Sequence, residues 1–164
     1  MTVESTVDRE ALSLTFNAVF DADIARVWQV WEDPRQLELW WGPPTWPASF
    51  PDHELTVGHE SRYYMTGPEG DKAHGWMRFD AVDEPTNIRF VDGFGDADGV
   101  PDHSMPENES IVTLTESDGQ TRMTIAASFD SIEALEKVLA MGMQEGMSLA
   151  LGQIDDILAG TLIR

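Results

Sequence analysis

The sequence contains no cysteine among its 164 residues, and lysine occurs only at Lys72 and Lys137. Without cysteine, disulfides, thiolate metal ligands and a cysteine nucleophile are excluded. Thirty acidic residues against ten basic ones give a formal charge of −20. That charge repels phosphate backbones and anionic lipid headgroups, so we expect neither nucleic-acid nor membrane binding. Whether the acidity only keeps the protein soluble or reflects a salt-rich cytoplasm stays open.

Metal and cofactor motifs are also absent. The histidines are His53, His59, His74 and His103, and none of them is paired four residues apart on a helix pattern. Asp96 to Gly99 looks like part of a calcium loop, but Phe94 and Met105 occupy two of the required ligand positions. Gly93 and Gly95 lack the third glycine and the following helix of a dinucleotide fingerprint. We therefore expect no metal and no cofactor.

The length of the chain suits one domain, which we place at residues 11–160 behind a flexible N-terminus at residues 1–10. Residues 1–11 carry acids where a secretory signal would need a basic start followed by an apolar run. We therefore expect a cytoplasmic protein.

The first third of the chain predicts one strand and two short helices. Residues 12–20 alternate between apolar and polar side chains, which is typical of a strand packed on one face. Apolar residues then recur at helical spacing within 23–32, and Asp33-Pro34 restarts the chain as an N-cap followed by proline at N1. A second helix is expected over 34–40.

The middle of the chain predicts an antiparallel meander. Turn sequences at 68–71, 83–86 and 117–120 separate the apolar runs, as in hairpins. The expected strands are 48–57, 60–66, 74–82, 87–94, 109–116 and 121–129, with a flexible loop at 95–108 over one end of the sheet.

The last part of the chain predicts one continuous helix over 131–159, about 43 Å long and apolar along one face. Gly142 and Gly146 lie one turn apart in it, where each costs about 0.8–1 kcal/mol relative to alanine. Either the helix packs closely on the sheet at these positions, or the missing side chains leave room for a ligand beside the adaptable Met143 and Met147.

Five of the six tryptophans fall between residues 28 and 46, which is more aromatic area than two short helices need for packing. These side chains either fill the core or wall a cavity. With five present, we expect at least one to reach a cavity.

Several motifs, in order, resemble a known family. Val27-Trp28, Asp33-Pro34 and Leu39-Trp40-Trp41-Gly42-Pro43 are similar to the N-terminal signature of the family named for the activator of the Hsp90 ATPase. The later landmarks are Val57-Gly58, Met65 to Gly70, His74-Gly75, Thr121 to Thr124 and Met141 to Met147. His59 and Met147 depart from the family pattern, which often has glycine and tryptophan there. The resemblance implies the helix-grip fold of lipid-transfer (START), birch-pollen-allergen and polyketide-cyclase (SRPBCC) proteins, and it carries no catalytic residues.

We therefore predict an α+β helix-grip fold, with a curved antiparallel sheet wrapped around a long C-terminal helix and two short helices after the first strand. The predicted function is non-catalytic binding of a small apolar or amphipathic molecule between sheet and helix. The candidate lining residues are Trp28, Trp40, Trp46, Tyr64, Trp76, Phe90, Gly142, Met143, Gly146 and Met147. The candidate polar residues of the pocket are Arg62, Arg78, Asp92 and Glu145.

Two alternatives remain. A cyclase- or hydrolase-like enzyme would use a polar pair in the same cavity for proton transfer on an aromatic or polyketide-type substrate. A chaperone-associated interaction module would follow from the family name by analogy alone. Strand parity does not say which face of the sheet lines the cavity, and a homodimer is left open.

Overall fold

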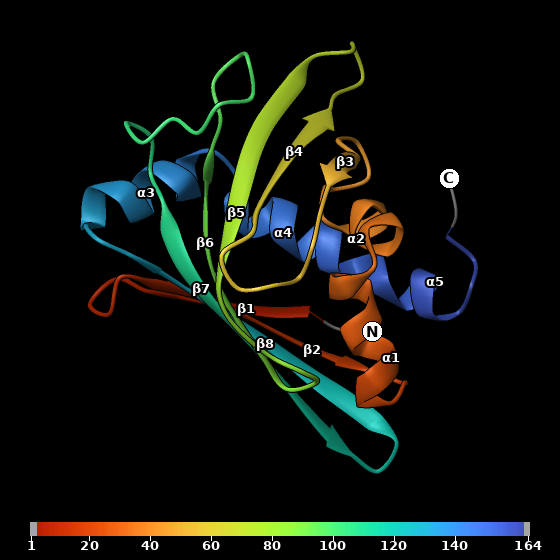
Figure 1. Ribbon diagram of the computed structural model, residues 1–164. Coiled ribbons are helices and arrows are strands. Elements are labelled where there is room, and N and C mark those ends of the chain that lie inside the picture. The colour runs from red at the N-terminus through yellow and green to blue at the C-terminus, as the bar shows by residue number, and fades with distance from the viewer. Residues whose placement is uncertain (1–2, 163–164) are drawn as a thin grey trace.

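The computed structural model describes residues 3–162 and contains one curved, eight-stranded antiparallel sheet (Figure 1). The strand order is β1-β2-β8-β7-β6-β5-β4-β3, so each neighbouring pair except β2–β8 is consecutive in the chain. The strands are β1 (Val3–Asp8), β2 (Ser13–Phe20), β3 (Ala48–Asp52), β4 (Glu60–Thr66), β5 (Lys72–Asp83), β6 (Asn87–Phe94), β7 (Asn108–Ser117) and β8 (Gln120–Phe129).

Two short helices follow β2, as the sequence predicts. Helix α1 (Ile24–Glu32) begins after Asp23, whose side chain accepts a hydrogen bond from the Arg26 backbone amide. Asp33 ends α1 and caps α2 (Pro34–Trp40), where Pro34 takes the first turn. Both helices bury their apolar faces in the core.

The core lies between the concave face of the sheet and the helices. Alternate residues of β2 are buried, which matches the period-two pattern of its sequence. Trp31 and Trp40 are fully buried, with ring centroids 4.9 Å apart in an edge-to-face arrangement. Trp28 is buried beside them, and its indole N–H has no hydrogen-bond partner.

The C-terminal helical region differs from the sequence prediction, because it is broken into three helices. These are α3 (Ile132–Ala140), α4 (Met143–Gly152) and α5 (Ile154–Leu158). Gly142 has a φ of +85°, a left-handed conformation that glycine adopts easily and that ends the α-helical path after α3. A second break falls at Gln153. In Figure 1 the sheet curves around α4, which packs against β1, β2 and α2.

Two further details correct the sequence predictions. Residues 3–8 of the predicted flexible N-terminus form the edge strand β1, which pairs with β2 from Val3↔Ala18 to Asp8↔Ser13. Strand β3 ends at Asp52 rather than at residue 57, after a register shift that begins beyond Ser49.

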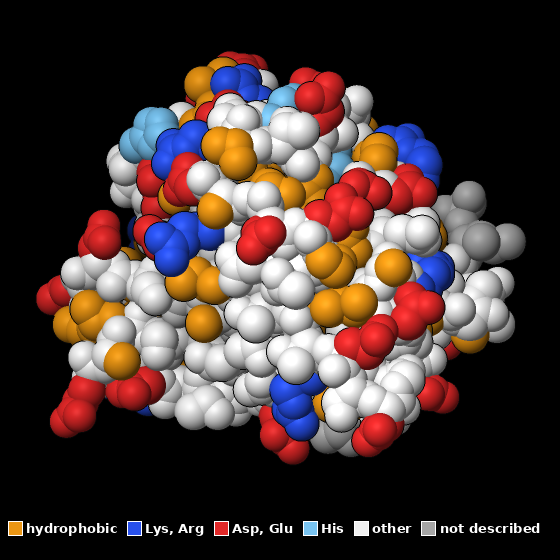
Figure 2. All heavy atoms as spheres, turned by 60° about the horizontal axis from the view of Figure 1, so that its bottom comes forward, with side chains coloured by type: hydrophobic (Ala, Val, Ile, Leu, Met, Phe, Trp, Pro, Cys, Tyr) orange, Lys and Arg blue, Asp and Glu red, His pale blue; other side chains and the backbone are white. Residues whose placement is uncertain are grey.

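The predicted helix-grip fold class is confirmed, with short helices after the first core strand and a helical C-terminal region on the concave side of the sheet. Within residues 3–162, no helix combines the length and the apolar character that crossing a bilayer requires. Acidic side chains are scattered over the face drawn in Figure 2, where basic side chains are fewer.

Candidate functional site

A largely apolar cavity of about 330 Å³ lies between strands β4–β6 and the junction of α3 with α4. Its wall comprises Trp41, Pro43, Trp46, Tyr63, Met65, Ala73, Asp92, Gly93, Phe94, Pro106, Asn108, Val138, Met141, Gly142, Met143, Gly146 and Met147. Pro106 and Asn108 come from the connection between β6 and β7 and the start of β7. Met141 is 52% exposed and also lines the cavity, so the cavity opens to solvent beside it.

The two helix glycines leave space on the cavity side. A Cβ atom added at Gly146 would meet no atom within 4 Å, and the same is true at Gly142. Close packing of helix on sheet therefore does not explain either glycine. The positive φ at position 142 favours glycine there. Gly146 has a helical backbone, and it borders open space between Met143 and Met147.

Two glycines, one in the sheet and one just beyond β4, pack against aromatic rings of the wall. Gly75 pairs across β4 and β5 with Tyr63, and a Cβ at Gly75 would collide with the Tyr63 ring. A Cβ at Gly67 would lie 2.6 Å from the Trp46 ring. Each ring therefore packs against backbone that carries no side chain, and a larger residue than glycine would displace it.

One end of the cavity is polar. The Tyr63 hydroxyl donates a hydrogen bond of 2.9 Å to Oδ1 of Asp92. Asn108 lies directly opposite Asp92 in the β6–β7 register, and its side chain also hydrogen bonds to Asp92. The Ser110 hydroxyl donates to Asn108 Oδ1 at 2.7 Å, which leaves the Asn108 amide group as the donor toward Asp92.

Burial dominates the protonation of this cluster. Loss of hydration raises the pKa of Asp92 to about 7, although hydrogen bonds from Tyr63, Asn108 and the Gly93 backbone oppose the rise. Loss of hydration also raises the pKa of Tyr63 well above its usual value, and the neighbouring Asp92 charge adds to that rise. The cluster thus holds an acid that changes protonation near neutral pH next to a tyrosine that stays protonated.

The cavity wall, as far as residues 3–162 form it, carries no positive charge. Among these wall residues there is no lysine, arginine or histidine. Within the described part of the chain, Asp92 takes part in no ion pair. In residues 3–162, no three or more histidine, aspartate or glutamate side chains gather closely enough to hold a metal ion.

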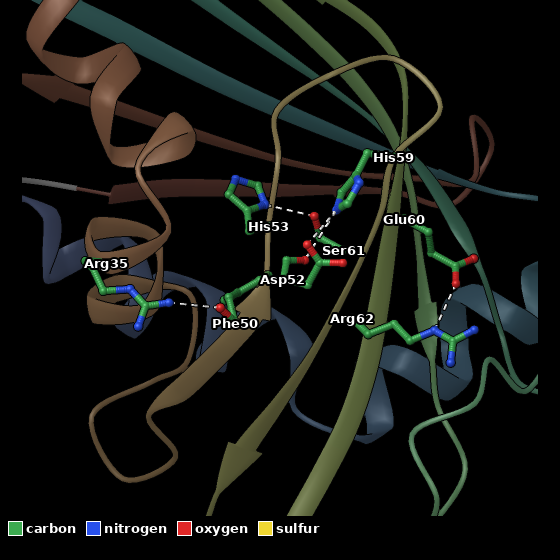
Figure 3. A network of polar contacts seen from close by, with 8 residues as sticks. All are labelled: Arg35, Phe50, Asp52, His53, His59, Glu60, Ser61 and Arg62. Atoms are coloured by element: carbon green, nitrogen blue, oxygen red, sulfur yellow. Dashed lines mark hydrogen bonds and ion pairs between the residues drawn. The ribbon is translucent and has the colours of Figure 1, made fainter.

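A second polar cluster lies outside the cavity, between α1 and the β3–β4 connection (Figure 3). His53 Nε2 lies 2.8 Å from the Trp31 carbonyl oxygen and Nδ1 lies 2.9 Å from the Ser61 hydroxyl. A carbonyl only accepts, so Nε2 carries the proton and the neutral ring accepts from Ser61. Burial lowers the His53 pKa. Because Ser61 is fully buried, this serine–histidine pair ties the connection to α1 rather than presenting a nucleophile.

The structure brings some of the predicted site residues together in the cavity wall. These are Trp46, Gly142, Met143, Gly146, Met147 and Asp92. They come from the α2–β3 connection, the last helices and β6, which are far apart in sequence. Their role in binding stays a prediction.

The other predicted site residues lie elsewhere. Trp28, Trp40 and Phe90 are buried in the core, below the cavity wall. Tyr64 and Trp76 fall on the opposite strand parity from Tyr63 and Met77, and therefore on the convex face of the sheet. The exposed side chains are Arg62, Arg78 and Glu145. On β4 and β5 the chosen residues thus came from the wrong face.

Sequence reasoning missed Trp41, Tyr63 and Asn108. The signal for Tyr63 was present, because Arg62 and Arg78 mark the solvent face of β4 and β5 and leave Tyr63 on the inner face. Trp41 lies one residue beyond the end of α2, so the helical spacing of apolar residues in α2 did not point to it. Asn108 became visible only through the pairing of β6 with β7.

Comparisons with known proteins agree with this architecture. The family model described as Activator of Hsp90 ATPase homolog 1-like protein matches residues 21–159. A solution NMR structure of a protein from Arthrobacter aurescens is 50% identical, has a TM-score of 0.92, and the match covers 96% of this chain and 91% of that one. The crystal structure of Ms6760 from Mycobacterium smegmatis is 46% identical, with a TM-score of 0.87 and coverage of 94% and 95%.

A more distant structure shares the fold alone. It is DynU16, from the dynemicin biosynthetic locus, which is 20% identical with a TM-score of 0.63 over 92% of this chain and 48% of that one. A search of curated proteins found no match to the chain.

Proposed function

The chain belongs to the Activator of Hsp90 ATPase homolog 1-like family, and we propose that it binds a small apolar or amphipathic molecule in the cavity between sheet and helices. The observation that carries this proposal is the cavity itself. It holds about 330 Å³ of space walled by tryptophan, methionine, phenylalanine and proline side chains, with one polar end. Pockets that bind small molecules combine these features.

The C-terminal wall supports adaptable binding. Met143 and Met147 line the cavity on consecutive turns of α4, and the Gly146 backbone between them is open. Methionine side chains adjust to varied apolar shapes, because they are unbranched and polarisable. Burial of ligand surface contributes roughly 25 cal/mol per Å², which is enough for micromolar affinity after the costs of association.

A fluorescence titration tests the proposal. An uncharged, environment-sensitive dye should bind with a stoichiometry of about one and quench tryptophan emission, because Trp41 and Trp46 line the cavity. Met147→Asp should abolish binding by placing a charge in the apolar wall. The matched control is Leu149→Asp on the same helix, because Leu149 is 59% exposed and lies outside the wall. Equal binding by both variants would refute the proposal.

A second candidate, proton-transfer catalysis, is favoured by one specific observation. Asp92 has a pKa of about 7 and sits beside Tyr63 in an apolar cavity, as suits a general acid or base. If this candidate is correct, Asp92 should exchange the α-protons of a bound apolar ketone such as octanone with solvent deuterium, followed by NMR. Exchange no faster than with Asp92→Asn would exclude it. An interaction with a chaperone rests on the family name alone.

A further inference from the structure

Asp92 is a carboxylate without a counter-charge in the wall of an apolar cavity. A carboxylate offers about four lone-pair positions. Three neutral donors reach it, namely the Tyr63 hydroxyl, the Asn108 side chain and the Gly93 backbone amide. One acceptor position therefore stays available, and the negative charge is balanced by no cation of the described chain.

The surroundings of Asp92 suit a positively charged group. The rings of Trp41 and Trp46 line the same cavity, and the faces of tryptophan rings attract cations. The Trp41 ring packs edge-to-face on Tyr63 with centroids 6.0 Å apart, and Tyr63 donates to Asp92, so an indole ring lies near the carboxylate. The formal charge of −20 on the whole protein also draws cations toward its surface and repels anions.

We propose that the molecule bound in the cavity is an amphipathic cation, whose charged nitrogen pairs with Asp92 while its apolar body contacts Met143, Met147 and Phe94. This inference rests on the proposed function, since it names the ligand class for the same cavity. The Asp92 carboxylate has already lost much of its hydration, so an ion pair with the ligand costs little further desolvation on the protein side. An anionic head group would meet a like charge at the same place.

Three ligands with one tail separate the inference from the proposed function. Octylamine, octanol and octanoate differ only in head-group charge, and calorimetric titration at about pH 8 keeps the amine charged and the Asp92 carboxylate mostly ionised. We expect octylamine to bind at least about tenfold more tightly than octanol, and octanoate to bind more weakly than both. Binding of none of the three would refute the proposed function. Equal binding of octylamine and octanol would overturn only the inference.

Two variants that each remove one negative charge test whether Asp92 causes the preference for octylamine over octanol. Asp92→Asn keeps the shape of the side chain and an oxygen for the Tyr63 hydrogen bond but removes the charge, so the preference for octylamine over octanol should disappear. Asp130→Asn removes the same charge at an exposed position outside the cavity wall and should keep the full preference. An equal loss in both variants would attribute the preference to net charge and overturn the inference. If Asp92→Asn does not fold, the comparison of the three ligands in the wild-type protein still decides.

Discussion

The Tyr63 hydroxyl donates to the Asp92 carboxylate at 2.9 Å across the inner face of the sheet, from β4 to β6. The two residues are not on neighbouring strands, because β5 runs between them. Gly75 of β5 has no side chain, and this lets the Tyr63 ring lie over that strand and reach Asp92. The acidic side chain that the described residues contribute to the cavity wall is thus held by a tyrosine, whose own position depends on a glycine.

Ionisation of Asp92 should make stability depend on pH in the direction opposite to most aspartates. Its folded pKa of about 7 lies above the ordinary 3.8, so the folded state binds the extra proton. The resulting stabilisation is present below about pH 4 and is lost as the pH rises through about 7. The pKa rise corresponds to at most about 4 kcal/mol over the whole pH range, and to at most about 2–3 kcal/mol between pH 5 and pH 8.

Asp92→Asn removes this titration, so the variant should gain up to about 2–3 kcal/mol over wild type between about pH 5 and pH 8. Urea denaturation at the two pH values measures this change. A stability difference that is the same at both would show that Asp92 ionises normally.

His53 should stay neutral where ordinary histidines are half protonated. Burial lowers its pKa below the ordinary value of 6.5, so its contribution to stability is present above that pH and is lost as the pH falls through the lower folded pKa. Nitrogen-15 NMR of the imidazole should show the proton on Nε2, which donates to the Trp31 carbonyl. A proton on Nδ1, or a titration midpoint at or above about 6.5, would contradict the assigned pair with Ser61.

Gly146→Leu should separate folding from binding. The site is open, so the longer side chain fills the cavity and the helix gains roughly 0.5–1 kcal/mol of propensity. The control is Gly152→Leu at the exposed end of the same helix, where open space also surrounds the added Cβ. Thermal unfolding should show comparable gains in both variants, whereas dye binding should be lost only in Gly146→Leu. A destabilised Gly146→Leu would mean that the helix packs closely at this position.

Gly75→Ala should cost about 1–3 kcal/mol, because the new methyl group collides with the Tyr63 ring. In a Tyr63→Ala background the collision partner is gone, so most of that cost should vanish. Chemical denaturation of the four proteins gives the coupling between the two positions. Additive effects would show that Gly75 does not seat Tyr63.

The sequence predicted the helices and strands correctly where apolar residues recur periodically or where a capping residue and proline mark a boundary. The alternation along β2 and the Asp33-Pro34 restart between α1 and α2 predicted those elements closely. It failed at the C-terminal region, since the apolar stripe continues through Gly142 and its left-handed conformation is a backbone property that the stripe does not encode. The edge strand β1 was missed because its stability comes from pairing with β2.

The site was partly predictable for the same reason. Asp92 and Met147 carry local signals, namely strand parity and helical spacing. The sequence prediction chose Tyr64 in place of its neighbour Tyr63. An error of one residue along a strand moves the chosen side chain to the other face of the sheet. Asn108 reaches Asp92 only through the register of β6 with β7, which no local pattern reports.

The most direct test of the cavity as a binding site is NMR of the methionine methyl groups during titration with octanol. We predict saturation at a stoichiometry of about one, with the largest shifts at Met65, Met143 and Met147 in the wall. Met77 and Met123, which are buried in the core away from the wall, should change little. Shifts without saturation, or shifts at Met77 and Met123 as large as those in the wall, would contradict binding in the cavity.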